Sequence, residues 1–444
     1  MRYIPHTPQD IQRMLDTIGV KDISELFSAI PSETKLDREL NLPQALSEQE
    51  LDIHMRKLAA KNADPADWIS FLGGGVYRHF SPAVISAIVA RSEFLTAYTP
   101  YQPEVSQGTL QAIFEFQTLM CQLTGMEVAN ASMYDGAEAF AESALMLLRI
   151  AKKKKRILCA SSVHPEYRQT LKTYTSRLDV TVEQIPYDAS SGKVEMSALE
   201  EKLNEDVAGV LVQSPNFFGV VEELKDIHAI CSGKGAMLTV AVAEPLSLGI
   251  LRPPGEYGAT ITCGEAQSFG VPPSFGGPGV GFLAGKMADV RNMPGRLCGQ
   301  TVDADGNRGF VLTLAAREQH IRREKATSNI CTNQALVALM VTIYLSLLGK
   351  RGITELAELN LSRAQYAKKL MKNRCEIKFS GETFNEFVVK MNDAKKRLSE
   401  LKSKGIIGGI LLERWYPELK DCVLVSVTEM NSKEQIDQYA ELMG

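Results

Sequence analysis

From Trp68 onward, short apolar runs alternate with segments of helical periodicity. Seven of the apolar runs have the length of strands: 128–133, 156–160, 180–185, 208–213, 236–242, 260–263 and 280–284. The helical periods between them cover residues 109–123, 137–151, 197–203 and 224–232. Strands that alternate with helices are typical of a mostly parallel sheet with helices on its faces. The sequence therefore predicts an α/β fold.

The N-terminal sequence predicts three amphipathic helices. The first begins after the N-cap residue Thr7 and ends before Gly19. The second covers residues 23–30, with its apolar side chains buried. The third begins after Ser47, which opens a capping box. Residues 1–65 are therefore predicted to form a helical N-terminal extension.

The C-terminal sequence predicts a long helix over 333–348, followed by a smaller unit of helices and strands. The predicted elements of this unit are 354–371, 376–379, 386–390, 393–404, 422–427 and 433–442. The sequence thus predicts a large α/β domain over 66–330 and a small C-terminal domain over 331–444, with boundaries accurate to a few residues.

The composition is that of a globular protein with a sizeable core, because 45% of its 444 residues are hydrophobic. A formal net charge of −4 supplies no basic surface for nucleic acid, and no apolar run approaches the roughly 20 residues of a membrane span. The N-terminus lacks the apolar core of a signal peptide, so we expect a cytoplasmic protein. The eight cysteines are scattered, which predicts reduced thiols and no metal site.

Glycine and proline are concentrated in residues 270–281, where five glycines and three prolines occur within twelve positions. Glycine allows a close approach of the backbone to a ligand or another chain, and proline stiffens the turn. The segment is therefore predicted to be a rigid, shaped loop. A flexible linker would contain Ser and Gly without the prolines.

A second unusual stretch is the polar and aromatic run from Tyr98 to Gly108. One interpretation is a proline-stiffened loop whose tyrosines cover the core. The other is a rigid wall with several hydrogen-bonding groups, which suits a small polar substrate.

These stretches resemble the glycine decarboxylase (P-protein) family of the glycine cleavage system, and the resemblance extends over essentially the whole chain. Residues 98–108 match the family pattern Tyr-Thr-Pro-Tyr-Gln-x-Glu-x-x-Gln-Gly almost completely. The glycine-rich loop also matches, at Phe269, Pro272, Gly276, Gly277, Pro278 and Gly279. The resemblance implies an aspartate-aminotransferase-like fold, which is pyridoxal-phosphate fold type I. It also implies that Tyr98 and Tyr101 line the glycine pocket, with Gln102, Glu104 and Gln107 holding the loop.

The resemblance also shows three departures from a complete cofactor site. Gln267 stands at the position of the lysine that binds pyridoxal phosphate, and an amide cannot form a Schiff base. The turn expected to bind the cofactor phosphate carries two acids, Asp135 and Glu138. The strand expected to supply an Asp to the pyridine nitrogen has no Asp, and Glu244 lies slightly too far along to replace it.

Several other polar residues are candidates for a role in the site. By resemblance, Thr327, Ser328 and Asn329 are candidates for contacting the phosphate of a partner's cofactor in trans. Lys325 is either a substitute Schiff-base lysine or a surface cation, and its charged neighbours favour the surface cation. His79 and His164 are predicted to be structural histidines with satisfied hydrogen bonds.

The resemblance implies that the chain is the N-terminal half of a P-protein, made as a separate subunit. A lysine-bearing partner would hold pyridoxal phosphate, decarboxylate glycine and pass the aminomethyl group to the lipoyl arm of the H-protein. The assembly would be a heterodimer or heterotetramer, with this chain forming a wall of the pocket. Two alternatives remain open: a self-sufficient pyridoxal-phosphate enzyme that uses another lysine, and a non-catalytic scaffolding or regulatory pseudo-enzyme.

Overall fold

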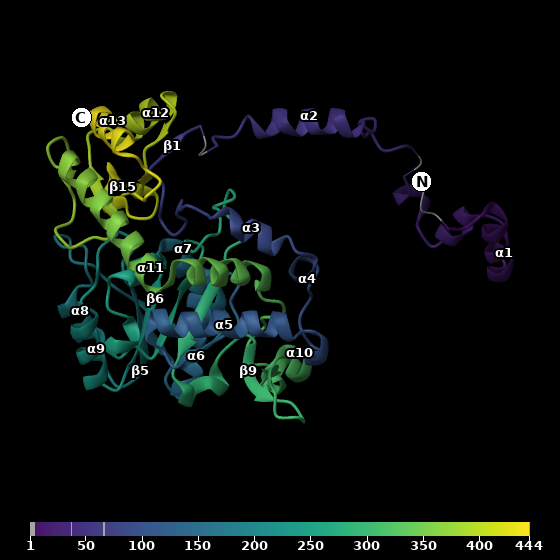
Figure 1. The fold of residues 1–444 in the computed structure, drawn as a ribbon, viewed down its shortest axis with the longest axis horizontal. Helices are drawn as coiled ribbons and strands as arrows, with labels where there is room; N and C mark the ends of the chain where they lie inside the picture. Colours follow the sequence, from purple (N-terminus) through teal and green to yellow (C-terminus); the bar gives the residue numbers. More distant parts are fainter. Residues whose placement is uncertain (1–4, 37, 65–66, 444) are drawn as a thin grey trace. The chain divides into compact units, whose positions relative to one another are not determined.

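The computed structural model describes residues 5–36, 38–64 and 67–443. The chain divides into two units, residues 1–64 and 65–444 (Figure 1). The first unit contains α1 (Pro8–Ile18) and α2 (Glu48–Ala59), and both helices begin with a complete capping box. The N-cap at Thr7 and the capping box at Ser47 were predicted. Between them lie two short 3₁₀ helices, η1 (Ile23–Phe27) and η2 (Ser32–Thr34).

The prediction for residues 23–30 is wrong in two respects. The segment forms only the five-residue η1, and its apolar side chains are exposed rather than buried. A 3₁₀ helix does not extend far, because its hydrogen-bond geometry is poorer than that of an α-helix. The unit also lacks a second layer to cover these side chains, since Leu15 is the one buried apolar residue among its described residues.

The second unit is built on a seven-stranded sheet with the strand order β2-β8-β7-β6-β5-β3-β4. The strands are β2 (Val128–Ala129), β3 (Arg156–Ala160), β4 (Thr181–Ile185), β5 (Val207–Gln213), β6 (Met237–Val242), β7 (Ile261–Glu265) and β8 (Gly281–Gly285). All seven lie within a few residues of the predicted runs. β8 is antiparallel to β2 and β7, and the other neighbouring pairs are parallel. The connection from β7 to β8 contains no helix, which fits an antiparallel pair.

In the described part of the chain, eight helices belong to the region of the large sheet. The helices of this region are α3 (Ala83–Val89), α4 (Ser92–Leu95), α5 (Gln107–Thr124), α6 (Gly136–Ala151), α7 (Pro165–Thr175), α8 (Met196–Lys202), α9 (Leu224–Gly233) and α10 (Gln319–Arg322). α6 packs on β7 and β5. An antiparallel hairpin of β9 (Leu297–Val302) and β10 (Arg308–Thr313) packs on α5. Neither α7 nor this hairpin was predicted from the sequence.

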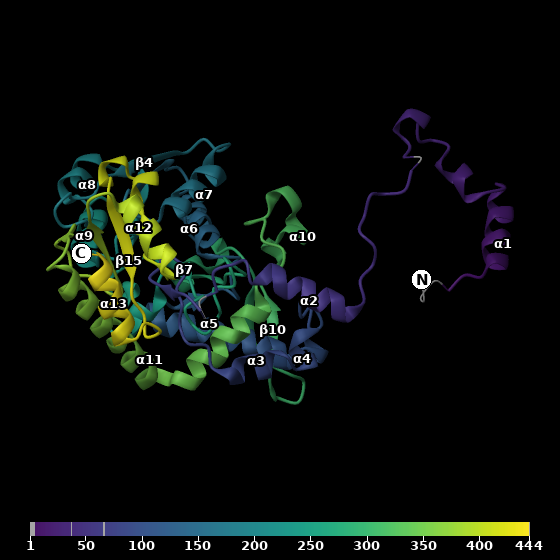
Figure 2. The same cartoon turned by 90° about the horizontal axis from the view of Figure 1, so that it is seen from above.

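The two helices predicted over 333–348 and 354–371 form one element, α11 (Ala335–Met371), which bends at Gly349 (Figure 2). Gly349 has φ 59° and ψ −175°, a conformation that other residues rarely adopt. By length and composition, α11 is apolar enough to cross a membrane, although the sequence had predicted no such segment. Its first half packs into the main core through Val341, Tyr344 and Leu345, as a core helix does.

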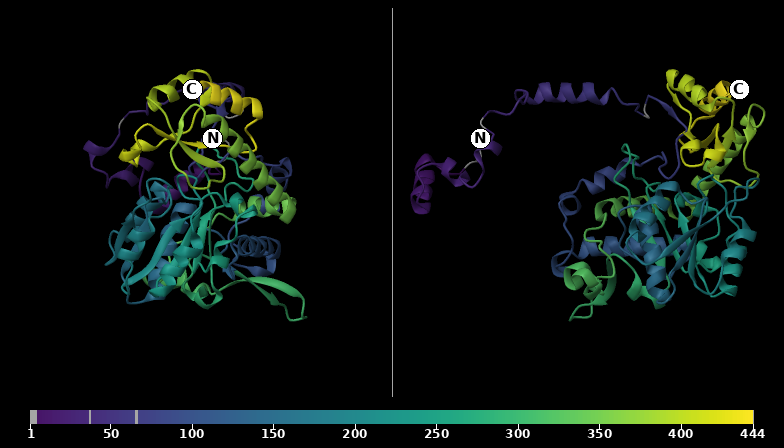
Figure 3. Two further views of the ribbon diagram at one scale, coloured as in Figure 1. Left: turned by 90° about the vertical axis from the view of Figure 1, so that its left-hand side faces the viewer. Right: turned by 180° about the vertical axis from the view of Figure 1, so that it is seen from behind.

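A second, antiparallel sheet follows α11, with the strand order β11-β12-β15-β14. Its strands are β11 (Glu376–Ile377), β12 (Glu386–Lys390), β14 (Ile410–Leu411) and β15 (Cys422–Ser426), and it carries α12 (Ala394–Ser403) and α13 (Lys433–Met443). This sheet and its helices lie at one end of the larger sheet (Figure 3).

The small sheet is tied to the start of the second unit. β1 (Ile69–Ser70) pairs with β13 (Ile406–Ile407), so the chain begins the unit beside the C-terminal elements. Phe217 and Phe218, from the large-sheet region, share a core cluster with Tyr416 and Leu424. Residues 65–444 form one unit by their contacts, so the division at residue 330 into a large and a small domain stays a prediction.

Candidate functional site

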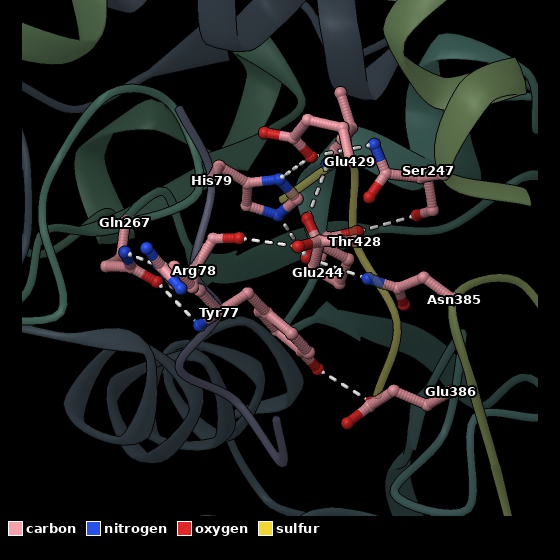
Figure 4. A network of polar contacts seen from close by, with 12 residues as sticks. Tyr77, Arg78, His79, Glu244, Ser247, Gln267, Asn385, Glu386, Thr428 and Glu429 are labelled. Carbon is pink, nitrogen blue, oxygen red and sulfur yellow. Dashed lines mark hydrogen bonds and ion pairs between the residues drawn. The ribbon is translucent and has the colours of Figure 1, made fainter. Parts of the chain in front are cut away.

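Gln267 lies just after β7, and its side chain is 4% exposed. Its Oε1 accepts a hydrogen bond from the backbone N–H of Tyr77 at 2.9 Å. Its Nε2 donates to the carbonyl of Tyr77 at 3.0 Å and to the carbonyl of Val271 at 2.5 Å. Both ends of the amide are therefore used to hold backbone, as Figure 4 shows for Tyr77. Gln267 links the glycine-rich loop to residues near the start of the unit and has no free reactive group.

The N-terminus of α6, where the resemblance predicts a phosphate, is occupied by a side chain of the protein. The carboxyl group of Glu265 accepts hydrogen bonds from the backbone N–H groups of Gly136 at 3.0 Å, Gln267 at 3.1 Å and Val280 at 2.7 Å. Burial raises the pKa of Glu265 to about 7. The first N–H of α6, which could bind an oxyanion, is thus already paired with the carboxyl group of Glu265.

Asp135 and Tyr167 also contact the turn at the start of α6. Asp135 caps α6 by accepting a hydrogen bond from the N–H of Glu138 at 2.8 Å. A Cβ at Gly136 would lie 2.0 Å from the hydroxyl oxygen of Tyr167, so that ring packs directly against the turn. Asp135 adds a second acidic side chain beside Glu265.

A cavity of about 220 Å³ remains beside Gln267. Glycines and prolines of the 273–279 loop, Gly74, Gly75 and Tyr167 form part of its wall. Its ionisable residues are Asp135, His164, Glu166, Tyr167 and Glu265. No Lys or Arg is among the described residues that line it. This lining disfavours a phosphate dianion, and with Gln267 in place of lysine the residues present do not fit pyridoxal phosphate.

His164, which follows β3, uses both ring nitrogens. Its Nδ1 accepts a hydrogen bond from the N–H of Glu166 at 3.1 Å, and its Nε2 lies 2.7 Å from the carbonyl oxygen of Gly74. Burial lowers the pKa of His164, so the ring is neutral and Nε2 donates to that carbonyl. The ring stacks on Tyr167 with a centroid distance of 4.9 Å. His164 is therefore a neutral histidine whose ring nitrogens and ring face all have partners within the protein.

His79 lies between two carboxylates and is 2% exposed (Figure 4). Its Nε2 is 3.0 Å from Glu244 Oε2, and its Nδ1 is 2.8 Å from Glu429 Oε2. Burial alone would lower the pKa of His79, but the two carboxylates outweigh burial and raise this pKa to about 10. His79 is therefore a buried cation. Glu244 follows β6, close to where the fold would place an acid beside the pyridine ring, and it is paired with His79 instead.

The Tyr98–Gly108 stretch does not line the cavity at Gln267, and its two tyrosines are exposed to solvent. Tyr98 is 73% exposed and borders a cavity of about 230 Å³ formed with α4, α5 and the start of α11. Tyr101 is 51% exposed, and its hydroxyl oxygen accepts a hydrogen bond from Arg296 Nη2 at 3.0 Å. Both aromatic rings are thus presented on the surface rather than packed into the core.

Gln107 anchors the stretch, as predicted. Its Nε2 donates to the carbonyls of Pro103 at 2.7 Å and Phe310 at 2.9 Å, and its Oε1 accepts from the N–H of Phe310 at 2.8 Å. Hydrogen bonds of this kind are not observed for the side chains of Gln102 and Glu104 within the described residues, so their predicted holding role remains a prediction.

The segment with the predicted contacts in trans is held by α6. The carbonyl of Thr327 accepts from Arg149 Nη1 at 2.9 Å, and Ser328 Oγ donates to Glu142 Oε1 at 3.0 Å. Asn329 is exposed. Lys325 is exposed on the 3₁₀ turn η8 (Arg323–Lys325) and is not among the residues that line the cavity at Gln267. A role for Lys325 as the Schiff-base lysine has no support in this geometry.

Sequence reasoning missed Glu265 and Arg296, which are the two side chains that do most to define these sites. Glu265 stands only two residues before Gln267, so an acid beside the missing lysine was an available signal. Arg296 had no such signal, because it lies 195 residues from Tyr101. Among the described residues, no group of three or more His, Cys, Asp or Glu side chains is arranged to hold a metal ion.

Comparison with known proteins agrees with this architecture. A family model described as "Glycine cleavage system P-protein" matches residues 1–443. The probable glycine dehydrogenase (decarboxylating) subunit 1 of Anoxybacillus flavithermus is 53% identical to this chain. The match covers 100% of this chain and 98% of that protein. A crystal structure of glycine decarboxylase (P-protein) in inhibitor-bound form has a TM-score of 0.89 and 41% identity, covering 100% of this chain and 99% of that one.

More distant structures show the fold alone. A glutamate decarboxylase from Lactobacillus brevis is 12% identical, with a TM-score of 0.70 and coverage of 94% of this chain and 96% of that chain. The structural neighbours are enzymes of pyridoxal-phosphate fold type I, which confirms the predicted fold class. The predicted family is confirmed as well: the chain belongs to the glycine cleavage system P-protein family.

Proposed function

We propose that this chain is the lysine-free subunit of a two-chain glycine decarboxylase, and that its partner holds the pyridoxal phosphate. The observation that carries the proposal is the state of the cofactor pocket, where Gln267 is bonded to backbone and Glu265 fills the anion position. Support also comes from the relatives, because they are named subunit 1 and this chain spans 98% of the length of the first of them. A subunit 1 implies a second subunit.

Within this proposal, pyridoxal phosphate on the partner supplies the electron sink for the pair released when glycine loses CO2. This chain contributes Tyr98 and Tyr101, whose exposed rings form a wall that excludes water and positions the glycine carboxylate. Thr327, Ser328 and Asn329 contact the phosphate of the partner's cofactor. The two chains assemble as a heterodimer or heterotetramer in the cytoplasm, and the aminomethyl group passes to the lipoyl arm of the H-protein.

The first test is whether the chain binds the cofactor by itself. We expect the purified chain, incubated with pyridoxal phosphate, to be colourless after desalting and to carry no modified lysine after borohydride reduction and peptide mapping. The lysine-bearing partner, treated in parallel, should carry one. A stoichiometric modified lysine in this chain, at Lys325 or elsewhere, would instead establish the self-sufficient enzyme.

A second test restores the missing lysine alone. We expect Gln267→Lys to leave glycine decarboxylation by this chain at background, because Glu265 still binds the N–H of Gly136 at the start of α6 and Glu244 is still paired with His79. The measurement is release of labelled CO2 from carboxyl-labelled glycine. Gln111→Lys, on the exposed face of α5, controls for the added charge. Turnover by Gln267→Lys above that of Gln111→Lys would contradict the assignment.

A further inference from the structure

Arg296 is a buried cation directly beneath the exposed Tyr101. The arginine is 4% exposed, and its Cζ lies 5.4 Å from the centroid of the Tyr101 ring. Its Nη2 donates to the Tyr101 hydroxyl oxygen at 3.0 Å, and its Nη1 lies 3.4 Å from Asn333 Oδ1. Two different parts of Tyr101, the ring face and the hydroxyl, are therefore held by one guanidinium group.

The direction of the Arg296–Tyr101 hydrogen bond decides what the tyrosine offers to a ligand. A guanidinium group has donors and no acceptor, so the phenol oxygen must be the acceptor. The single O–H proton of Tyr101 is then left to be donated elsewhere. A positive charge behind the oxygen also strengthens the hydroxyl as a donor, and a carboxylate is the natural acceptor for such a group.

Arg296 is paired with an acid, and its shortest hydrogen bond goes to Tyr101. Glu318 is the nearest acid, with its Oε2 3.7 Å from Arg296 Nε and also 3.7 Å from His320 Nδ1. These separations are too long for hydrogen bonds, and Arg296 Nε has no hydrogen-bond partner. The His320 ring meets the Tyr101 ring edge-on at 6.0 Å. Tyr101 is thus the best-placed hydrogen-bond acceptor for Arg296.

We propose that Arg296 is a positioning residue that turns the O–H of Tyr101 outward, toward the carboxylate of glycine in the partner's pocket. The inference rests on the proposed function, in which Tyr101 lines that pocket. This role requires a tyrosine at position 101. Because its hydroxyl oxygen accepts the hydrogen bond from Arg296, its O–H proton is left to be donated to the glycine carboxylate.

A double-mutant cycle in the assembled two-chain enzyme tests this inference. We expect Arg296→Gln to lower kcat/KM for glycine about tenfold, the size of one hydrogen bond to a charged group. In a Tyr101→Phe background, which has no hydroxyl to orient, the same change should cost less than about twofold. Arg296→Lys, which keeps the charge, should recover part of the activity and provides a second variant if Arg296→Gln does not fold.

The chain offers a closely matched control. Arg168 also donates to a tyrosine hydroxyl at 3.0 Å, that of Tyr416, with its Cζ 5.4 Å from the ring centroid. Arg168→Gln removes the same pair of contacts in another part of the unit, so kcat/KM should stay within about twofold of the wild type. Size-exclusion chromatography confirms assembly of each variant.

The outcomes separate this inference from the function on which it rests. Equal losses for Arg296→Gln in the wild-type and Tyr101→Phe backgrounds would overturn the positioning role and leave Tyr101 in the pocket. No loss for Tyr101→Phe alone would overturn both the role of Tyr101 and the inference.

Discussion

Replacing His79 with alanine should lower the free energy of unfolding by about 3–5 kcal/mol, because it leaves two buried carboxylates without their cation. Glu244 and Glu429 each lie within 3.0 Å of a ring nitrogen of His79. The cluster also joins three distant segments: residues near the start of the second unit, the end of β6 and the turn after β15. Loss of the imidazole therefore removes both the charge balance and a link between the two sheets.

Urea denaturation monitored by circular dichroism measures this loss. His54→Ala serves as a control, since His54 is exposed on α2 and its removal should change the free energy of unfolding by less than about 0.5 kcal/mol. His79→Ala costing less than 1 kcal/mol would mean that the carboxylates find other partners.

The loss of stability in His79→Ala should also depend on pH, because folding shifts the pKa values of both His79 and Glu429. The pKa of His79 rises from 6.5 to about 10 on folding, so its contribution is complete below pH 6.5 and is lost as pH rises toward 10. The pKa of Glu429 falls below 4.5 on folding, because its hydrogen bond and ion pair with His79 outweigh burial, and this contribution is lost in acid. The wild type should therefore exceed His79→Ala in stability most strongly between about pH 4.5 and 6.5. A difference independent of pH would argue against a charged histidine.

The large sheet was predictable because the information for it is local. Most of the strands from β3 to β8 contain a short apolar run, and such a run is visible without knowing its neighbours. The β9–β10 hairpin was missed because glycine and polar residues interrupt the apolar residues of both strands, and its packing against α5 depends on tertiary contacts. The pairing of β1 with β13 joins residues 69–70 to 406–407, which no local pattern indicates.

The same distinction applies to the site. The absence of a lysine at Gln267 is visible in the sequence, and so is the acidic turn at Asp135. The contacts that these side chains make are not visible, because each joins residues far apart in the chain. Glu265 reaches the N–H of Gly136 across 129 residues, and His79 meets Glu244 across 165. The sequence thus indicates which residue types the pocket contains, and the structure shows which groups they contact.

Tyr98→Phe and Tyr101→Phe should each lower kcat/KM for glycine by tenfold to a hundredfold in the assembled enzyme. Glycine has no side chain to recognise, so binding must depend on a close-fitting pocket and on donors for its carboxylate. Each change removes one hydroxyl with little change of shape, and a hydrogen bond to a charged group is worth about 1–3 kcal/mol. Both side chains are exposed in this chain, so the losses should appear only when the partner completes the pocket.

Tyr187→Phe is the matched control for these two variants. Its hydroxyl donates to Glu418 Oε1 at 2.7 Å in a different cavity, so its removal should leave kcat/KM unchanged. Assembly of every variant with the partner is checked by size-exclusion chromatography. A loss confined to Tyr98 and Tyr101 places them at the reacting glycine. Unchanged kinetics for both, in fully assembled enzyme, would make the 98–108 stretch structural and would favour a scaffolding subunit.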